Sequence, residues 1–180
     1  MESMETKNIG LRDITVADTK ISYIDGKKGK LIYRGFDVLD LTKNSNFEET
    51  CYLLLHDSLP TQKEFEEFKK ELRDSRHIAP QMQKNMSNWR KEAEPMDVLQ
   101  AFVAALAGYY NEEGSAKEIS YQRAINLIAK VPTIVASWER IRNSKEPIQP
   151  DSSLSHAANF LYMLKGKNQI KNLKGFSMCV

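Results

Sequence analysis

Apolar and polar residues alternate along two short segments near the start of the chain. Ile21 and Tyr23 stand between polar neighbours, and Leu31 and Tyr33 resume the same period of two beyond a turn that contains glycine. Such alternation around a turn predicts a β-hairpin with Ile21 and Tyr23 pointing inward. Two strands bury too little apolar surface to be stable alone, so we expect the hairpin to lie on the helices that follow.

From Phe47 onward the apolar positions follow a helical period, and start signals divide the chain into helices. Three pairs of residues have the spacing of a capping box: Asn46 with Glu49, Thr61 with Glu64, and Ser115 with Glu118. Pro80 and Pro95 each suit the first turn of a helix. We therefore predict helices from 47 to near 59 and from 61, 80, 95 and 115, the last reaching 142 with a kink at Pro132. A final helix is predicted from a cap at Ser152 or Ser153 to Gly166.

The predicted helix at 95–110 differs from the others because it is apolar nearly all round. Leu99, Phe102 and Leu106 cover one side, while Ala101 and Ala104 lie on the other. A helix of this kind is buried on both sides, which a subunit interface would achieve. The methionine and aromatic positions at 82, 86, 89, 160 and 162 are interpreted as core packing.

Composition and charge narrow the function classes. The chain has 180 residues, 41% of them hydrophobic, which is enough for one sizeable core. Its 26 basic and 24 acidic residues leave a net charge of +2, which selects neither nucleic acid nor an anionic membrane. Cys51 and Cys179 lack disulfide or zinc spacing. With no basic and apolar leader at the start and no run long enough to span a bilayer, we expect a cytoplasmic protein.

Six segments resemble, in order, the N-terminal part of the citrate synthase family, in its short prokaryotic and archaeal type. They are GLRD at 10–13, TKISYIDGKKGKLIYRGFD at 19–37, FEETCYLLLHDSLPT at 47–61, PMDVLQAFVAAL at 95–106, NLIAKVPTIVASWERIR at 126–142 and LSHAANFLYML at 154–164. The resemblance implies an all-α fold, the helical large domain of citrate synthase, with a small N-terminal β-hairpin. Residues 1–167 would be the N-terminal part of that domain, and residues 168–180 a tail foreign to the family.

The resemblance also implies a reaction, the condensation of acetyl-CoA with oxaloacetate to citrate. The family uses an Asp base, two His donors and several Arg to hold the substrate carboxylates, and needs no cofactor. In the family these groups lie beyond residue 167, so we expect a truncated chain that is inactive alone. Homodimerisation through helices around 95–110 and 115–142 is implied as well. A 2-methylcitrate synthase fragment and a non-catalytic helical dimerisation protein remain as alternatives.

No catalytic residue and no metal ligand is assigned from the sequence. His56, His77 and His156 share no known spacing with a nucleophile or a ligand and are interpreted as structural. Arg12, in the family's GLR segment, is a candidate contact to the phosphates of CoA, because a guanidinium suits phosphate. Arg34 is interpreted as structural. The lysines at 165, 167, 171 and 174 are interpreted as solvated rather than as a nucleic-acid site.

Overall fold

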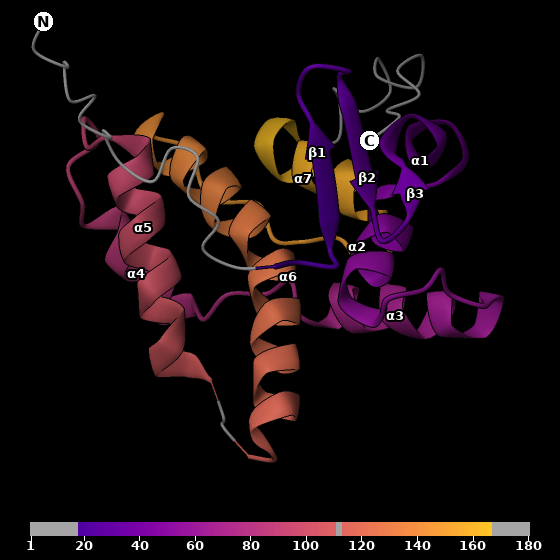
Figure 1. Ribbon diagram of the computed structural model, residues 1–180. Coiled ribbons are helices and arrows are strands. Elements are labelled where there is room, and N and C mark those ends of the chain that lie inside the picture. The colour runs from indigo at the N-terminus through magenta and orange to yellow at the C-terminus, as the bar shows by residue number, and fades with distance from the viewer. Residues whose placement is uncertain (1–17, 111–112, 167–180) are drawn as a thin grey trace, which may run out of the picture.

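The computed structural model describes residues 18–110 and 113–166, which form helices and one small sheet (Figure 1). The strands are β1 (Ser22–Asp25), β2 (Lys30–Tyr33) and β3 (Phe36–Asp37). The helices are α1 (Val38–Asn44), α2 (Phe47–His56), α3 (Gln62–Asp74), α4 (Pro80–Ser87), α5 (Pro95–Ala105), the 3-10 turn η1 (Leu106–Tyr109), α6 (Ala116–Arg142) and α7 (His156–Lys165). The all-α class with an N-terminal hairpin is confirmed. The domain boundary at 167 stays a prediction, because it lies at the edge of the described residues.

The predicted hairpin is present, but the orientation predicted for its side chains is wrong. β1 pairs antiparallel with β2, placing Tyr23 opposite Ile32, and β3 continues the sheet on the far side of β2. Tyr23 is 57% exposed and Ile21 is 47% exposed. The reason is that α1 packs against β2 and β3, which leaves β1 as an uncovered edge strand.

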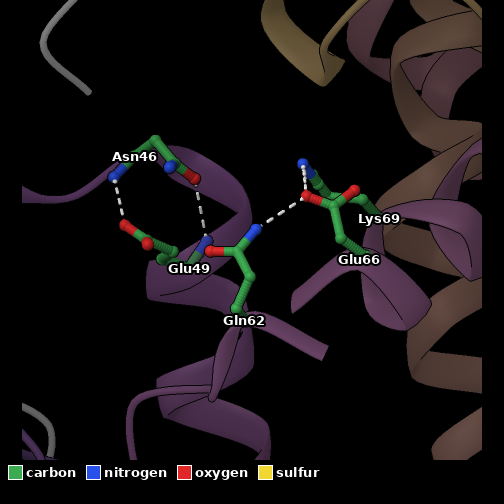
Figure 2. A network of polar contacts seen from close by, with 5 residues as sticks. All are labelled: Asn46, Glu49, Gln62, Glu66 and Lys69. Carbon is green, nitrogen blue, oxygen red and sulfur yellow. Dashed lines mark hydrogen bonds and ion pairs between the residues drawn. The ribbon is translucent and has the colours of Figure 1, made fainter. Parts of the chain in front are cut away.

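All three predicted capping boxes form. In each, the side chain of the N-cap residue accepts from the backbone N–H of the glutamate, whose carboxylate accepts from the N-cap N–H in return. Figure 2 shows this exchange for Asn46 and Glu49, and beside it Glu66 of α3 accepting from Gln62 and Lys69. Pro80 and Pro95 occupy the first turns of α4 and α5. Start signals in the sequence therefore located these helices correctly.

Two predicted helix ends were displaced. α2 ends at His56 rather than near 59, because Asp57 adopts a left-handed conformation with φ of 66° and closes the helix. α7 begins after Ser155, whose side chain accepts from the N–H of Ala158, and not after Ser152 or Ser153. The N–H and hydroxyl of Ser153 are instead bonded to the Asp151 carboxylate in the preceding turn.

The long helix α6 lies at the centre of the described structure. Figure 1 shows it running between α4 and α5 on one side and α2 and α3 on the other, with α7 beside its later half. α6 contributes residues to two buried clusters. In the first, Ile125 and Ala129 of α6 pack with Tyr52, Phe68 and Leu72. Further along, α6 contributes to the second cluster: Ile78, Met82, Met86, Val98, Phe102, Leu106, Ile134, Trp138 and Ile141.

Several predicted core positions lie elsewhere than expected. Met82 and Met86 are buried as predicted. Trp89 lies beyond the end of α4 and is 39% exposed, although its ring contacts Phe102 of the core. On α7, Phe160 and Tyr162 are only half-buried. That helix turns His156, Asn159 and Met163 inward instead, which is one stripe at helical spacing.

Helix α5 is covered on one face only. Val98, Phe102 and Leu106 are buried, whereas Met96 is 62% exposed and Ala104 is also exposed. Its prediction as a helix buried on both sides is therefore not met within the described residues. Nor does it run to 110, since the backbone tightens into η1 after Ala105. Among residues 18–110 and 113–166, no helix combines the length and apolar character needed to cross a bilayer.

Candidate functional site

The three histidines occupy three different segments. His56 is the last residue of α2 and is exposed, His77 is exposed between α3 and α4, and His156 is buried at the start of α7. The ring of His56 contacts the ring of Tyr52, while that of His156 contacts Phe47. The candidate CoA contact Arg12 lies outside the described residues and stays a prediction.

His56 lies between two surface pockets. Its imidazole stacks on Tyr52 with 4.1 Å between ring centroids and meets the ring of Tyr121 at 5.4 Å. On one side lies a surface pocket of about 650 Å³ between the end of α2 and the start of α6, which Lys117 and Glu118 help to line. On the other side is a pocket of about 210 Å³ that carries three carboxylates, from Glu64, Glu67 and Glu71.

Two of the carboxylates around His56, those of Glu64 and Glu71, are engaged in structural contacts. Glu71 accepts hydrogen bonds of 2.9 Å from the Tyr121 hydroxyl and from the Gln122 amide. Glu64 closes the capping box of α3 and its carboxylate also bonds to Tyr52. Burial, followed by the Glu71 carboxylate, raises the pKa of Tyr121, so its hydroxyl stays protonated at neutral pH. This arrangement holds α2, α3 and α6 together.

Arg34 is confirmed as a structural residue. Its guanidinium donates to the carbonyl oxygen of Leu54 at 3.2 Å and pairs with Asp57 at 2.5 Å. Both partners lie at the end of α2, where Leu54 offers a carbonyl that the helix leaves free. Arg34 itself has a φ of 46° and is followed by Gly35 with a φ of 89°, so the turn after β2 aims the side chain at α2. The hairpin is attached to the helices through this contact.

A second group of ionisable residues is buried beneath α7. Glu48 on α2 accepts from the backbone N–H of His156 at 2.9 Å. Arg76, between α3 and α4, donates to the carbonyl oxygens of Asp151 at 3.1 Å and Leu154 at 3.0 Å. The Arg76 carbonyl in turn accepts from the Thr133 hydroxyl of α6 at 2.9 Å. Four segments of the chain are therefore joined at one place.

Neither Arg76 nor Glu48 was singled out by its sequence context. Arg76 stands in an ordinary charged stretch, DSRH, and Glu48 in the first turn of a helix where acidic residues are common. The partners of Arg76 are 75 and 78 residues away. No local spacing carries that information, so only the tertiary structure reveals the cluster.

Cys51 lies within the described residues, and its surroundings make its thiol unreactive. The side chain is half-buried on α2. Burial, and then the negative charge of Glu48, raises the pKa of the Cys51 thiol to about 12. A thiol protonated at neutral pH is a poor nucleophile and a poor metal ligand. Among the described residues, no group of three or more His, Cys, Asp or Glu side chains is placed to hold a metal ion.

The exposed face between α5 and α6 forms an apolar depression of about 130 Å³. Met96, Leu99, Val135 and Trp138 are among its lining residues. Exposed apolar surface rimmed by polar residues is typical of a contact with another protein surface. This depression lies on the two helices that the sequence predicted as the subunit interface.

A family model and several curated proteins that match this chain share one family name. Residues 10–178 match a family model described as "Citrate synthase, C-terminal domain". The citrate synthase of a Synechocystis strain is 40% identical over 169 residues, which cover 93% of this chain and 42% of that protein. The citrate synthase of Haloferax volcanii is 37% identical, covering 88% of this chain and 43% of that protein. The citrate/2-methylcitrate synthase of Bacillus subtilis is 33% identical over a match that covers 93% of this chain and 45% of that protein.

Solved structures agree with these sequence matches. The citrate synthase of Pyrobaculum aerophilum superposes with a TM-score of 0.81 at 37% identity, over 88% of this chain and 42% of that one. The citrate synthase of Thermotoga maritima gives a TM-score of 0.77 at 35% identity, over 92% of this chain and 44% of that one. The chain thus spans less than half the length of the relatives it matches.

Proposed function

The chain belongs to the citrate synthase family, and we propose that it serves an acyltransferase that condenses acetyl-CoA with oxaloacetate to give citrate. The observation that carries this proposal is the 40% identity to a citrate synthase over 93% of the chain. The TM-score of 0.81 to a second citrate synthase supports it independently. Acetyl-CoA enters as a substrate, and no cofactor is part of the proposal.

Within that enzyme we propose that the described residues supply scaffold rather than reacting groups. The reaction needs a carboxylate base and neutral donors converging on one thioester. Near His56, the carboxylate of Glu64 is engaged in a cap and that of Glu71 in hydrogen bonds to Tyr121 and Gln122. His156 is buried against Phe47. We therefore propose that the 180-residue polypeptide is inactive by itself.

We also propose that α5 and α6 form a homodimer interface. The apolar depression lined by Met96, Leu99 and Trp138 supports this, as does the exposure of Met96 and Ala104 on the uncovered side of α5. Small residues on that side allow a second helix to approach closely.

We further propose that Arg12 contacts the phosphates of CoA. We also propose a cytoplasmic location, because the two cysteines lack disulfide spacing.

A second candidate substrate is propionyl-CoA, which would make the enzyme a 2-methylcitrate synthase. The relative named citrate/2-methylcitrate synthase, 33% identical, favours keeping this possibility. One added methylene changes binding by only about 1 to 3 kcal/mol, so small differences in the acyl pocket decide between the two substrates. A non-catalytic dimerisation protein is the remaining alternative, and it rests on the same apolar depression.

A chimera separates the acyltransferase from the dimerisation protein. The segment of the Synechocystis citrate synthase that this chain matches is replaced by the corresponding residues of this chain, and thiol release from acetyl-CoA is followed with and without oxaloacetate. We expect oxaloacetate-dependent release by the chimera and none by the 180-residue chain. A folded but inactive chimera would favour the dimerisation protein, whereas activity of the isolated chain would overturn the scaffold proposal.

A further inference from the structure

Three ionisable side chains from separate segments are buried together where α7 begins. Glu48 of α2 is 8% exposed, Arg76 of the link between α3 and α4 is 1% exposed, and His156, the first residue of α7, is 6% exposed. Buried charged groups are rare unless they are hydrogen-bonded, because burial removes them from water. The hydrogen bonds of this cluster therefore replace contacts with water that its charged groups lose on burial.

Two charged side chains of the cluster, Arg76 and Glu48, contact the backbone that leads into α7. The Arg76 guanidinium donates to the carbonyl oxygens of Asp151 and Leu154, and the Glu48 carboxylate accepts from the N–H of His156. The loop is also bonded to α7 itself, since the N–H of Asp151 donates to the amide oxygen of Asn159 at 2.8 Å. Residues 151–156 are thus attached to α2 and to the α3–α4 link by polar contacts.

The imidazole of His156 fits this site only in its neutral form. It stacks on Phe47 with 4.6 Å between centroids and an interplanar angle of 14°, and its Nδ1 is buried without a hydrogen-bond partner. Protonation would add a donor without an acceptor and a second cation near Arg76. Among the described residues the charges that act on the ring are Arg76 and Glu48, and Asp151 faces Arg76 in turn.

We propose that Glu48, Arg76 and His156 form a proton-sensitive clasp that holds α7 at neutral pH and releases it, with its leading loop, when His156 is protonated. Burial lowers the pKa of His156, Arg76 lowers it further, and Glu48 opposes both. The open segment therefore binds a proton more tightly than the docked one. Docking is at full strength above the ordinary histidine pKa of about 6.5 and weakens as the pH falls from there toward the lowered pKa of the docked state.

Hydrogen–deuterium exchange of the 180-residue chain tests the clasp without depending on enzyme activity. Protection of residues 156–165, corrected for the intrinsic rate at each pH, is compared at pH 7.5 and pH 5.0. We expect it to fall by roughly threefold or more at the lower pH. Protection of α3 should stay constant. An equal loss in α3 would mean that the whole fold weakens, and would overturn the proposal.

Two variants locate the effect. His156→Phe keeps a ring to stack on Phe47 but has no proton site, so α7 should lose its response to pH. His77→Phe changes an exposed histidine one residue from Arg76 and should respond like the unchanged chain. A pH response in His156→Phe equal to that of the unchanged chain would overturn the proposal.

A measurement on the unchanged chain decides the matter even if His156→Phe fails to fold. The Cε1–Hε1 resonance of His156 and the backbone amides of α7 are followed by NMR through a pH titration. The clasp requires one common midpoint, below that of an ordinary histidine. Separate midpoints for the ring and for α7 would show that the two events are not linked, and would overturn the proposal.

Discussion

The hydroxyl of Tyr121 donates a hydrogen bond of 2.9 Å to the carboxylate of Glu71, joining α6 to a helix fifty residues earlier in the chain. The same tyrosine ring meets His56, so one side chain contacts both α2 and α3. Glu71 also accepts from Gln122, the next residue of α6. This contact fixes the early half of α6 against the helices that precede it.

Replacing Tyr121 by Phe should lower the free energy of unfolding by about 1 to 2 kcal/mol, because the ring stays while a bond to a charged acceptor is lost. Urea denaturation followed by circular dichroism measures the change. Tyr23→Phe is the matched control, since that tyrosine is 57% exposed on the edge strand and should shift the free energy by less than about 0.5 kcal/mol. Equal effects of the two changes would contradict the importance of the bond to Glu71.

Removal of two neighbouring hydroxyls on α6 should affect the stability of the fold differently. Thr133→Val deletes the donor to the Arg76 carbonyl while preserving shape, and should cost about 1 to 2 kcal/mol. Ser137→Ala deletes a buried hydroxyl that has no hydrogen-bond partner, and should be neutral or slightly stabilising. Thermal unfolding of both variants under the same conditions gives the comparison. A loss in Ser137→Ala as large as that in Thr133→Val would show that burial alone, not the bond to Arg76, matters here.

Two methionines separate folding from association. Met86→Ala empties a fully buried position in the core and should cost about 2 to 5 kcal/mol. Met96→Ala changes a side chain that is 62% exposed and should leave the unfolding of the monomer within about 0.5 kcal/mol. Sedimentation equilibrium should show weaker self-association for Met96→Ala, because Met96 lines the depression between α5 and α6. Unchanged self-association would argue against an interface at this depression.

Acid should weaken the start of α6, because the capping contacts of Glu118 favour its charged form. The Ser115 hydroxyl and backbone hold the pKa of Glu118 below its usual value. The folded state therefore favours the charged form, so the contribution of Glu118 to stability is present above the usual glutamate pKa, about 4.3, and is lost as the pH falls through the lowered pKa.

Denaturation from pH 6 to pH 2 tests this for Glu118→Gln, which should be less stable than the unchanged chain at pH 6 and approach it at low pH. Glu92→Gln, at an exposed position, serves as the control and should follow the unchanged chain throughout. A difference between Glu118→Gln and the unchanged chain that persists to pH 2 would mean that its origin is not the charge of Glu118.

Local signals explain which parts of the fold were predictable. The capping boxes at Asn46, Thr61 and Ser115 and the prolines at 80 and 95 act within one helical turn, so the sequence alone located five helix starts. The start of α7 was misplaced because several serines compete there, and the bond from Ser153 to Asp151 favours a turn. Local spacing does not resolve that competition.

Burial and the polar cluster were less accessible to sequence reasoning because they depend on distant partners. Alternation predicted an inward Tyr23, but which strand of the sheet is covered depends on where α1 packs. His156 packs against Phe47, which is compatible with its interpretation as a structural residue. Its neighbours Arg76 and Glu48 carry no local signal, because each contact joins segments that are far apart in the sequence. The family itself was predictable, since its motifs are local and ordered.

The position of α6 has a consequence for how the protein comes apart. Its early half packs into the cluster with Tyr52 and Phe68, and its later half into the cluster with Met86 and Phe102. A helix of 27 residues propagates order from each residue to the next, so the melting of one cluster frays the backbone that supports the other. The two clusters should therefore give a single calorimetric transition, with equal van't Hoff and calorimetric enthalpies, rather than two separable ones.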